Sequence, residues 1–352
     1  MTGGPPPAGQ SQPGPQAQPA TGTRPAAGPL PSRCLGRSPV RVTELSFGAA
    51  AIGGLFAAVS EEDARAAVDA AWDGGIRTFD TAPHYGLGLS ERRLGAALRH
   101  RPRDEYVIST KVGRLLDPAA PGSPAGRDTE GFAVPARYVR RFDYSADGVR
   151  RSLEASLDRL GLDRVDIALI HDPDDHAEQA FREAYPALEE LRAAGTVRAI
   201  GAGMNQSAML TRFVTDTDVD AVLVAGRYTL LDRAAGRDLL PAAQRRGVAV
   251  IAGGVFNSGV LAAPGAGVTY DYQPAPPETI ARARRLAAAC ARYGVPLRAA
   301  AARFPLTHPA VASVLIGVRS AAEVTDALAL RALDIPAALW DSLATSDERG
   351  QS

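Results

Sequence analysis

Four side chains along the chain could together carry out proton transfer: Asp80, Tyr85, Lys111 and His171. A phenol has a pKa of about 10, too high for efficient proton exchange at neutral pH, and a nearby ammonium group lowers it by favouring the phenolate. A carboxylate keeps the ammonium charged and in place, and a histidine can hydrogen-bond a substrate oxygen. These residue types predict a tyrosine acid/base that faces a carbonyl or hydroxyl group. They include no nucleophile and no metal site, so a hydride cofactor would have to supply the redox equivalent.

Two residue types are rare enough in this chain to be informative. Lys111 is the one lysine among 39 basic residues. A single lysine in a chain that otherwise uses arginine favours a role that arginine cannot fill. The alternative is that a lysine remains at this position by chance. The two asparagines, Asn205 and Asn257, each follow an apolar segment. Asparagine is common in turns, but its carboxamide could also recognise another carboxamide such as that of nicotinamide.

The elements that position these residues follow from hydrophobic patterning. Eight short apolar runs predict strands buried on both faces: Leu45–Ile52, Arg77–Asp80, Tyr106–Lys111, Val165–His171, Val197–Gly201, Ala221–Val224, Val248–Ala252 and Ser313–Ile316. Amphipathic segments predict helices over Glu61–Gly74, Ser90–Arg99, Asp147–Leu160, Ala180–Ala194, Gln206–Thr217, Arg233–Arg246, Pro277–Tyr293, Ser320–Leu330 and Pro336–Leu343. Capping boxes are expected at Ser60 and Ser320.

This alternation of strands and helices predicts a (β/α)8 barrel. A doubly wound sheet is the alternative, but no Gly-x-Gly-x-x-Gly follows the first strand. In a barrel, Asp80, Lys111 and His171 would end three neighbouring strands and meet at one rim. The long connection 113–145 would project from the same face and could cover a site there.

The composition of the chain limits which partners, metal sites and domain arrangements are possible. The chain has 352 residues, and its 39 basic and 39 acidic residues give no net charge, which argues against a nucleic acid or an anionic membrane as the main partner. Two cysteines exclude a disulfide scaffold and a cysteine-ligated metal, and fit a cytoplasmic setting. Residues 1–38, rich in proline and glycine, are expected to form a disordered tail, 39–346 a single barrel and 347–352 a short tail. The expected assembly is a monomer or small homo-oligomer with a small-molecule substrate.

The segment Phe79–Gly95, Phe-Asp-Thr-Ala-Pro-His-Tyr-Gly-Leu-Gly-Leu-Ser-Glu-Arg-Arg-Leu-Gly, resembles the signature of the aldo-keto reductase family. The order Asp80, Tyr85, Lys111, His171 is similar to that family's catalytic tetrad. The resemblance implies a barrel that binds NAD(P) without a Rossmann domain. Tyr85 would be the acid/base, tuned by Lys111 and Asp80, and His171 would orient the substrate. His84 and Arg114 are the candidate substrate-binding residues.

The resemblance also suggests cofactor-binding residues on later strand ends. They are Asn205 for the nicotinamide carboxamide, Gly254, Phe256, Asn257 and Gly259 in a loop around the pyrophosphate, and Gly317, Arg319 and Ser320 at a helix N-terminus that could attract phosphate. Ala225 stands where the family usually has glutamine. Thr325 stands where a basic residue often holds a 2′-phosphate, which favours NAD over NADP with dual use left open.

Further stretches, among them Phe142–Ser145 and Gly226–Asp232, resemble the D-threo-aldose 1-dehydrogenase branch, to which pyridoxal 4-dehydrogenase is related. The branch implies NAD(P)-dependent oxidation of a free aldose of the L-fucose, L-galactose or D-arabinose type, or of a similar cyclic hemiacetal, to a lactone. A general NADPH-dependent aldehyde or ketone reductase is the first alternative. A non-catalytic nicotinamide-binding regulatory subunit is the second.

Overall fold

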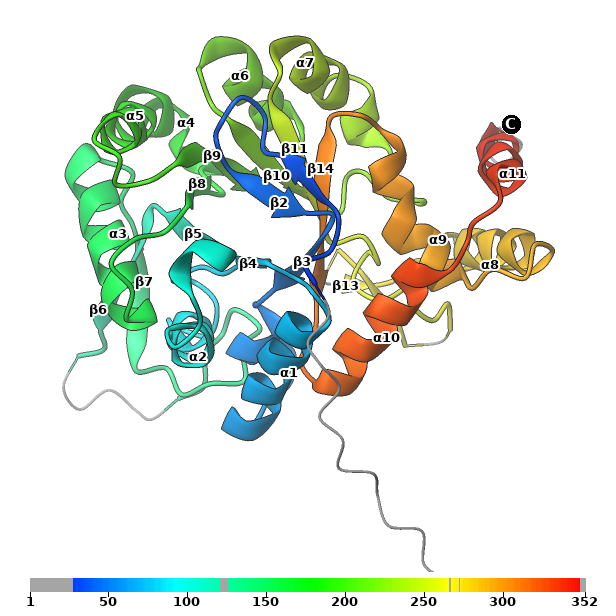
Figure 1. Cartoon of the computed structure of the whole chain (residues 1–352), viewed down its shortest axis with the longest axis horizontal. Coiled ribbons are helices and arrows are strands. Elements are labelled where there is room, and N and C mark those ends of the chain that lie inside the picture. The colour runs from blue at the N-terminus through cyan, green and yellow to red at the C-terminus, as the bar shows by residue number, and fades with distance from the viewer. Residues whose placement is uncertain (1–27, 121–125, 266, 272, 349–352) are drawn as a thin grey trace, which may run out of the picture.

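The computed structural model describes residues 28–120, 126–265, 267–271 and 273–348 (Figure 1). Within this part, eight parallel strands form a closed barrel in the order β10-β11-β14-β3-β4-β5-β8-β9. Their bounds are β3 Leu45–Gly48, β4 Thr78–Asp80, β5 Val107–Val112, β8 Ile167–His171, β9 Ala199–Met204, β10 Ala221–Ala225, β11 Ala249–Gly253 and β14 Val311–Gly317. All eight predicted strands are present, and the (β/α)8 prediction is confirmed.

The first predicted strand is shorter than expected. It ends at Gly48, and a 3-10 turn, Ala51–Gly53, replaces its second half. The N–H of Ala49 still reaches the carbonyl of Asp80 at 2.9 Å, but Gly53 donates back to Ala49 and Ala50 instead of to a neighbouring strand. The chain therefore turns at the rim, just where β3 and β4 bring it beside the predicted site.

Helices surround the barrel (Figure 1). They are α1 Glu61–Asp73, α2 Leu89–Leu98, α3 Ala146–Leu160, α4 Ala177–Gln179, α5 Tyr185–Ala193, α6 Ala208–Asp216, α7 Leu239–Arg246, α8 Pro277–Ala291, α9 Leu297–Arg303, α10 Ala321–Ala332 and α11 Ala337–Glu348. The side chains of Ser60 and Ser320 cap α1 and α10, as predicted. Helix α9 was not predicted, because its alanine-rich run is almost wholly buried and has no polar face. No helix in the described ranges is long and apolar enough to cross a membrane.

The strand side chains alternate between two cores. On β8, Ala168 and Ile170 join the core between sheet and helices, whereas Ile167 and Leu169 belong to the cluster inside the barrel. Alternate residues of a strand therefore enter different cores. Because both faces are buried, each strand is apolar along its whole length in the sequence. The rigid sheet fixes the positions of the residues at its carboxyl ends.

The N-terminal end of the described chain differs from the expected tail. Residues 28–38 contain strand β1, Ser32–Cys34, which pairs antiparallel with β2, Arg41–Thr43. Leu35 in the turn between them is fully buried and packs in the interior cluster. The hairpin closes one end of the barrel, a role that its proline- and arginine-rich sequence does not signal. Residues 1–27 and 349–352, which hold most of the two predicted tails, lie outside the described residues.

The long connection after β5 is built on a hairpin. Strands β6, Arg114–Pro118, and β7, Tyr138–Phe142, pair antiparallel. Beyond them, Phe56 donates its N–H to Gly131 O and Ala133 donates to Gly54 O, both at 2.8 Å. These bonds fasten the connection to the β3–α1 loop, so that it covers one side of the rim.

Candidate active site

A buried ion pair links the ends of β4 and β5. Lys111 Nζ lies 2.6 Å from Asp80 Oδ1 and also donates to the carbonyl of Thr81 at 3.0 Å. Both side chains are almost fully buried. The pairing of β4 with β5 brings Asp80 opposite Ser109, two residues before Lys111, which sets this distance. Asp80 Oδ2 has no hydrogen-bond partner among the described residues.

Tyr85 lies against this pair, with Lys111 Nζ 4.9 Å from the centre of its ring. A tight turn places it there: the N–H of Tyr85 donates to Ala82 O at 3.1 Å, and Ser90 N donates to Tyr85 O at 3.2 Å. Gly86, with φ of +61°, follows, and a Cβ there would meet Gly53 O at 2.1 Å. The glycine after the tyrosine is therefore required by close backbone approach.

The pKa of Tyr85 is raised to about 12. Burial is the largest cause, and the charge of Asp80 adds to it, while the charge of Lys111 and its hydrogen bond act in the opposite direction. The contribution of Lys111 thus has the predicted sign, but the net direction is the reverse of the one expected from the ammonium alone. Asp80 in turn helps to raise the pKa of Lys111 above its ordinary value, against the effect of burial. At neutral pH Tyr85 is therefore a phenol and Lys111 an ammonium.

Two histidines complete this rim. The ring of His171 stands perpendicular to that of Tyr85, with centres 5.8 Å apart, and the ring of His84 lies 5.6 Å from that of His171. Burial and the positive charges of Arg114 and Lys111 lower the pKa of both histidines, that of His84 to about 2. Both imidazoles are therefore neutral at pH 7. The Nδ1 atom of each has no hydrogen-bond partner among the described residues.

Phe132 and Arg140 bring the covering connection onto the rim. The ring of Phe132 is centred 5.2 Å from that of His84 and 6.1 Å from that of Tyr85. Arg140 donates to Asp128 at 2.5 Å and to the carbonyl of His84 at 3.0 Å. The expectation that this connection could cover a site agrees with its position over the Tyr85 side of the rim.

Arg114, a candidate substrate-binding residue, has a partner inside the protein. Its Nη2 donates to Asp172 Oδ2 at 2.6 Å. Asp172 adopts a φ of +42°, and the buried Tyr144 hydroxyl donates to the carbonyls of His171 and Asp172 at 2.6 and 3.0 Å. Arg114 and Tyr144 thus fix the backbone that carries His171, an arrangement that the sequence did not reveal.

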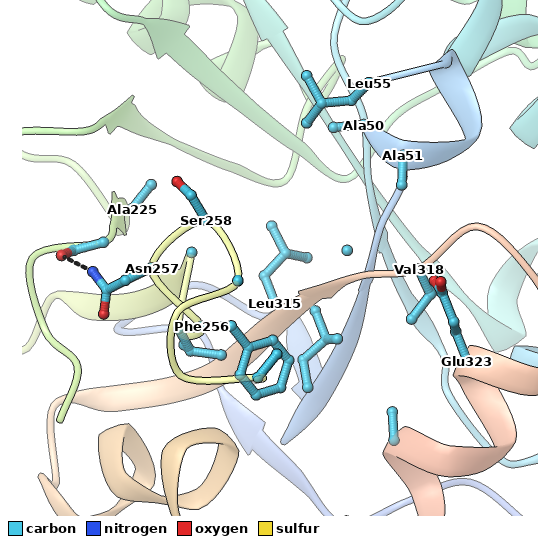
Figure 2. A pocket seen from close by; sticks show the side chains of 18 of the residues that line it. Ala50, Ala51, Leu55, Ala225, Phe256, Asn257, Ser258, Leu315, Val318 and Glu323 are labelled. Atoms are coloured by element: carbon cyan, nitrogen blue, oxygen red, sulfur yellow. Dashed lines mark hydrogen bonds between the residues drawn. The ribbon is translucent and has the colours of Figure 1, made fainter. Parts of the chain in front are cut away.

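A cavity of about 500 Å³ opens beside this rim, at the carboxyl ends of β3, β9, β10, β11 and β14. Seven of the eight predicted cofactor residues line it: Asn205, Gly254, Phe256, Asn257, Gly259, Gly317 and Arg319. Ser320 does not line it; its hydroxyl accepts the N–H of Glu323 as the cap of α10. Ala225 also lines the cavity (Figure 2).

The lining fits a dinucleotide. It is mostly apolar, and Asn257 offers a buried Oδ1 without a partner among the described residues while its Nδ2 donates to Gly226 O at 3.1 Å. A Cβ at Gly259 or Gly317 would meet nothing within 4 Å, so both glycines border open space that a ligand can fill. Figure 2 shows the Phe256 ring among the lining side chains, between Asn257 and the β14 side of the cavity.

Four charged lining residues were missed by sequence reasoning: Asp271, Arg298, Glu323 and Asp326. Glu323 was interpreted as part of a capping box: its N–H does donate to Ser320 Oγ, but its carboxylate accepts the N–H of Arg319 instead of that of Ser320. Nothing in the spacing shows that this carboxylate also borders a cavity. Within the described residues, no group of three or more His, Cys, Asp or Glu side chains could hold a metal ion.

A parallel barrel with a partly buried tyrosine against a buried lysine–aspartate pair at one rim, and a nucleotide-sized cavity beside it, defines a class of oxidoreductase. A sequence profile of the Aldo/keto reductase family matches residues 44–348, and the chain belongs to that family. It is therefore an oxidoreductase that acts on a small molecule with a nicotinamide nucleotide, as the resemblance implied.

The chain is similar to two characterised dehydrogenases. It is 48% identical to D-threo-aldose 1-dehydrogenase of a Pseudomonas species, with 86% of this chain and 93% of that protein covered. It is 44% identical to pyridoxal 4-dehydrogenase of Microbacterium luteolum, with 88% and 96% covered. Among solved structures, the holo form of an aldo-keto reductase from Bacillus halodurans has a TM-score of 0.70 at 24% identity, over 90% of this chain and 96% of that one.

Proposed function

We propose that this enzyme oxidises the anomeric carbon of a free aldose of the L-fucose, L-galactose or D-arabinose type, or of a similar cyclic hemiacetal such as that of pyridoxal, to a lactone. The observation that carries the chemistry is the buried Lys111–Asp80 pair directly against Tyr85 and beside the cavity. The substrate class rests on the two dehydrogenases named above.

In its phenolate form, Tyr85 takes the proton of the anomeric hydroxyl as the C1–H bond breaks and the lactone C=O bond forms, and it becomes a phenol. The cavity lined by Asn205, Gly259 and Gly317 would hold NAD(P)⁺, which would supply the acceptor for the hydride that leaves C1. Lys111 stabilises the Tyr85 phenolate, and Asp80 keeps Lys111 charged in a site where burial would otherwise favour the neutral amine. His171, neutral at pH 7, hydrogen-bonds the reacting oxygen and orients it toward Tyr85.

The substrate lies between Tyr85, His84 and the covering connection. His84 is neutral, and its Nδ1 lies 3.6 Å from Glu130 Oε2 without a hydrogen-bond partner among the described residues, so it can hydrogen-bond a sugar hydroxyl. Phe132 provides an apolar face next to Tyr85 and His84. Arg114 supports this site through Asp172, which its guanidinium holds.

Reduction of an aldehyde with NADPH or NADH is the second candidate. One observation favours it: the raised pKa of Tyr85 keeps the phenol protonated at neutral pH, ready to donate a proton to a carbonyl. The same four residues serve both directions. The two readings differ in the direction that runs at physiological pH and in the substrate that is bound.

The cofactor is expected to be NAD rather than NADP. Thr325, at the place of the basic residue, uses its hydroxyl to donate to Ala321 O at 2.9 Å within α10. It offers no charge to a 2′-phosphate.

The test is reduction of NAD⁺ and NADP⁺ by purified protein with L-fucose, L-galactose, D-arabinose and pyridoxal, with Tyr85→Phe alongside. Turnover with lactone as product, lost in the variant, supports the dehydrogenase. NADPH-driven reduction of simple aldehydes without aldose oxidation would replace it with the second candidate. Nucleotide binding without turnover in either direction would overturn both.

A further inference from the structure

Two carboxylates occupy one end of the cofactor cavity. Glu323 and Asp326 both line it from α10, with 44% of each side chain exposed. This exposure leaves them accessible to a ligand. A cavity built for the pyrophosphate of a dinucleotide and for a further phosphate would be expected to offer cations there, so the negative sign of these charges calls for an explanation.

Geometry identifies this end as the one far from the chemistry. Asn205 lines the cavity directly after β9, and its backbone N–H donates to the carboxylate of Asp172, next to His171. Figure 2 shows Glu323 beside Val318, across the cavity from Ala225 and Asn257. With the nicotinamide near the tetrad, the adenosine of the dinucleotide reaches Glu323 and Asp326.

The groups that could hold a phosphate at this end are already engaged. Glu323 Oε2 accepts the backbone N–H of Arg319 at 2.9 Å, and Glu323 Oε1 lies 3.3 Å from Arg319 Nε. Asp326 pairs with Arg298, the other arginine in the lining. Both cations are thus neutralised by carboxylates of α10, and the N–H before the helix is occupied by a negatively charged oxygen.

We infer that Glu323, with Asp326 in support, selects NAD⁺ against NADP⁺: its carboxylate accepts a hydrogen bond from the adenosine 2′-hydroxyl and repels a 2′-phosphate. The inference rests on the proposed use of a nicotinamide nucleotide and deepens it. A ribose hydroxyl donates to a carboxylate, whereas a phosphate has only acceptors at neutral pH and adds nearly two negative charges beside an existing one.

Equilibrium binding tests this without catalysis. NADH and NADPH are titrated by nucleotide fluorescence against the wild type, Glu323→Gln, Asp326→Asn and the double variant. Asp334→Asn, an exposed aspartate outside the cavity lining, is the matched control. The wild type should bind NADH at least about tenfold more tightly than NADPH. Glu323→Gln should tighten NADPH by about tenfold and change NADH by less than about threefold, with a smaller effect of Asp326→Asn.

A second comparison separates the nicotinamide from the adenosine end. ADP and 2′,5′-ADP, which lack the nicotinamide, should show the same preference and the same response to Glu323→Gln. In Glu323→Gln combined with Arg319→Gln the gain for 2′,5′-ADP should disappear, because the released guanidinium is what the phosphate uses. The thermal midpoint of each variant reports whether the loss of the capping interaction, rather than charge, explains a change.

Equal binding of NADH and NADPH by the wild type, or an unchanged ratio in Glu323→Gln, would overturn the inference while leaving the proposed function intact. Absence of binding by either dinucleotide would instead contradict the proposed function. Loss of both affinities in Glu323→Gln, with a lowered thermal midpoint, would show that Glu323 only caps α10 and would also overturn the inference.

Discussion

The two halves of the rim are built differently. At the ends of β4, β5 and β8 the charges are buried and paired within the protein, as Lys111 and Asp80 show. At the ends of β10, β11 and β14 the chain leaves a cavity of about 500 Å³, bordered by glycines and by half-exposed ion pairs on α10. The first half is complete before any ligand binds, and the second is shaped to receive one.

This difference separates the residues that carry out proton transfer from the residues that select the ligand. The groups that set the pKa of the acid/base lie at the ends of hydrogen-bonded strands in a low dielectric. A neighbouring charge shifts a pKa strongly in such surroundings. Groups that choose a ligand lie on loops and a helix start, where a substitution changes affinity with little effect on the fold. Substitutions in the two halves should therefore have different consequences.

The largest effect is expected at the tetrad, from Tyr85→Phe. It removes the acid/base and should lower kcat/KM by about 10²- to 10⁴-fold, because general acid–base catalysis contributes that much. The affinity for NADH should stay within about twofold, since Tyr85 does not line the cavity. Steady-state kinetics and fluorescence titration measure both. If Tyr85→Phe instead bound NADH much more weakly but kept its kcat, Tyr85 would act in cofactor binding and not in the chemistry.

Lys111→Met should break the buried pair. It leaves the Asp80 carboxylate uncompensated and should lower the free energy of unfolding by about 3–5 kcal/mol. Arg319→Met, which opens a half-exposed pair at the cavity, should change it by less than about 1 kcal/mol. Denaturant unfolding gives both values. Lys111→Met combined with Asp80→Leu should recover stability but not activity, and similar losses at the two sites would contradict the comparison.

The pH dependence of oxidation follows from the raised pKa of Tyr85. Because that pKa is about 12, the phenolate fraction of the free enzyme grows about tenfold per pH unit below it. Oxidative kcat/KM should therefore rise steadily from pH 7 to 10, and reductive kcat/KM should not. Burial lowers the pKa of His171, so no inflection is expected near pH 6.5. A plateau above pH 8 would show that the ligand-free pKa does not control the step.

The sequence revealed the first half of the rim better than the second. Asp80, Lys111 and His171 end continuous apolar runs, so the strand pattern alone brings them together. The fold of the covering connection and the hairpin at Leu35 depend on contacts between residues distant in the chain, which periodicity does not report. Ser320 and Glu323 illustrate the limit, because one motif, Ser-Ala-Ala-Glu, caps a helix and also decides which charge meets the cavity.

Tyr144→Phe tests how His171 is held. The hydroxyl donates to the carbonyls of His171 and Asp172, so its loss should lower kcat by about tenfold while the affinity for NADH is kept. Tyr106→Phe is the control, because the Tyr106 hydroxyl is also buried but has no hydrogen-bond partner among the described residues. Both are assayed well below their thermal midpoints. Equal kinetics for the two variants would show that the backbone of His171 needs no such support.

The smallest effects should come from the same substitution made once in each half. At Gly53 an added Cβ would lie 3.1 Å from the backbone of Tyr85, so Gly53→Ala must move the catalytic turn by a few tenths of an ångström. At Gly317 an added Cβ meets nothing within 4 Å and projects into open space. Gly53→Ala should therefore lower kcat by a few fold, at nearly unchanged NADH affinity. Gly317→Ala should weaken NADH by a few fold and leave the thermal midpoint unchanged or slightly raised, because alanine restricts the unfolded chain. If both variants changed the same parameter, the tetrad and the cavity would act as one unit, and the division between prebuilt chemistry and ligand selection would not hold.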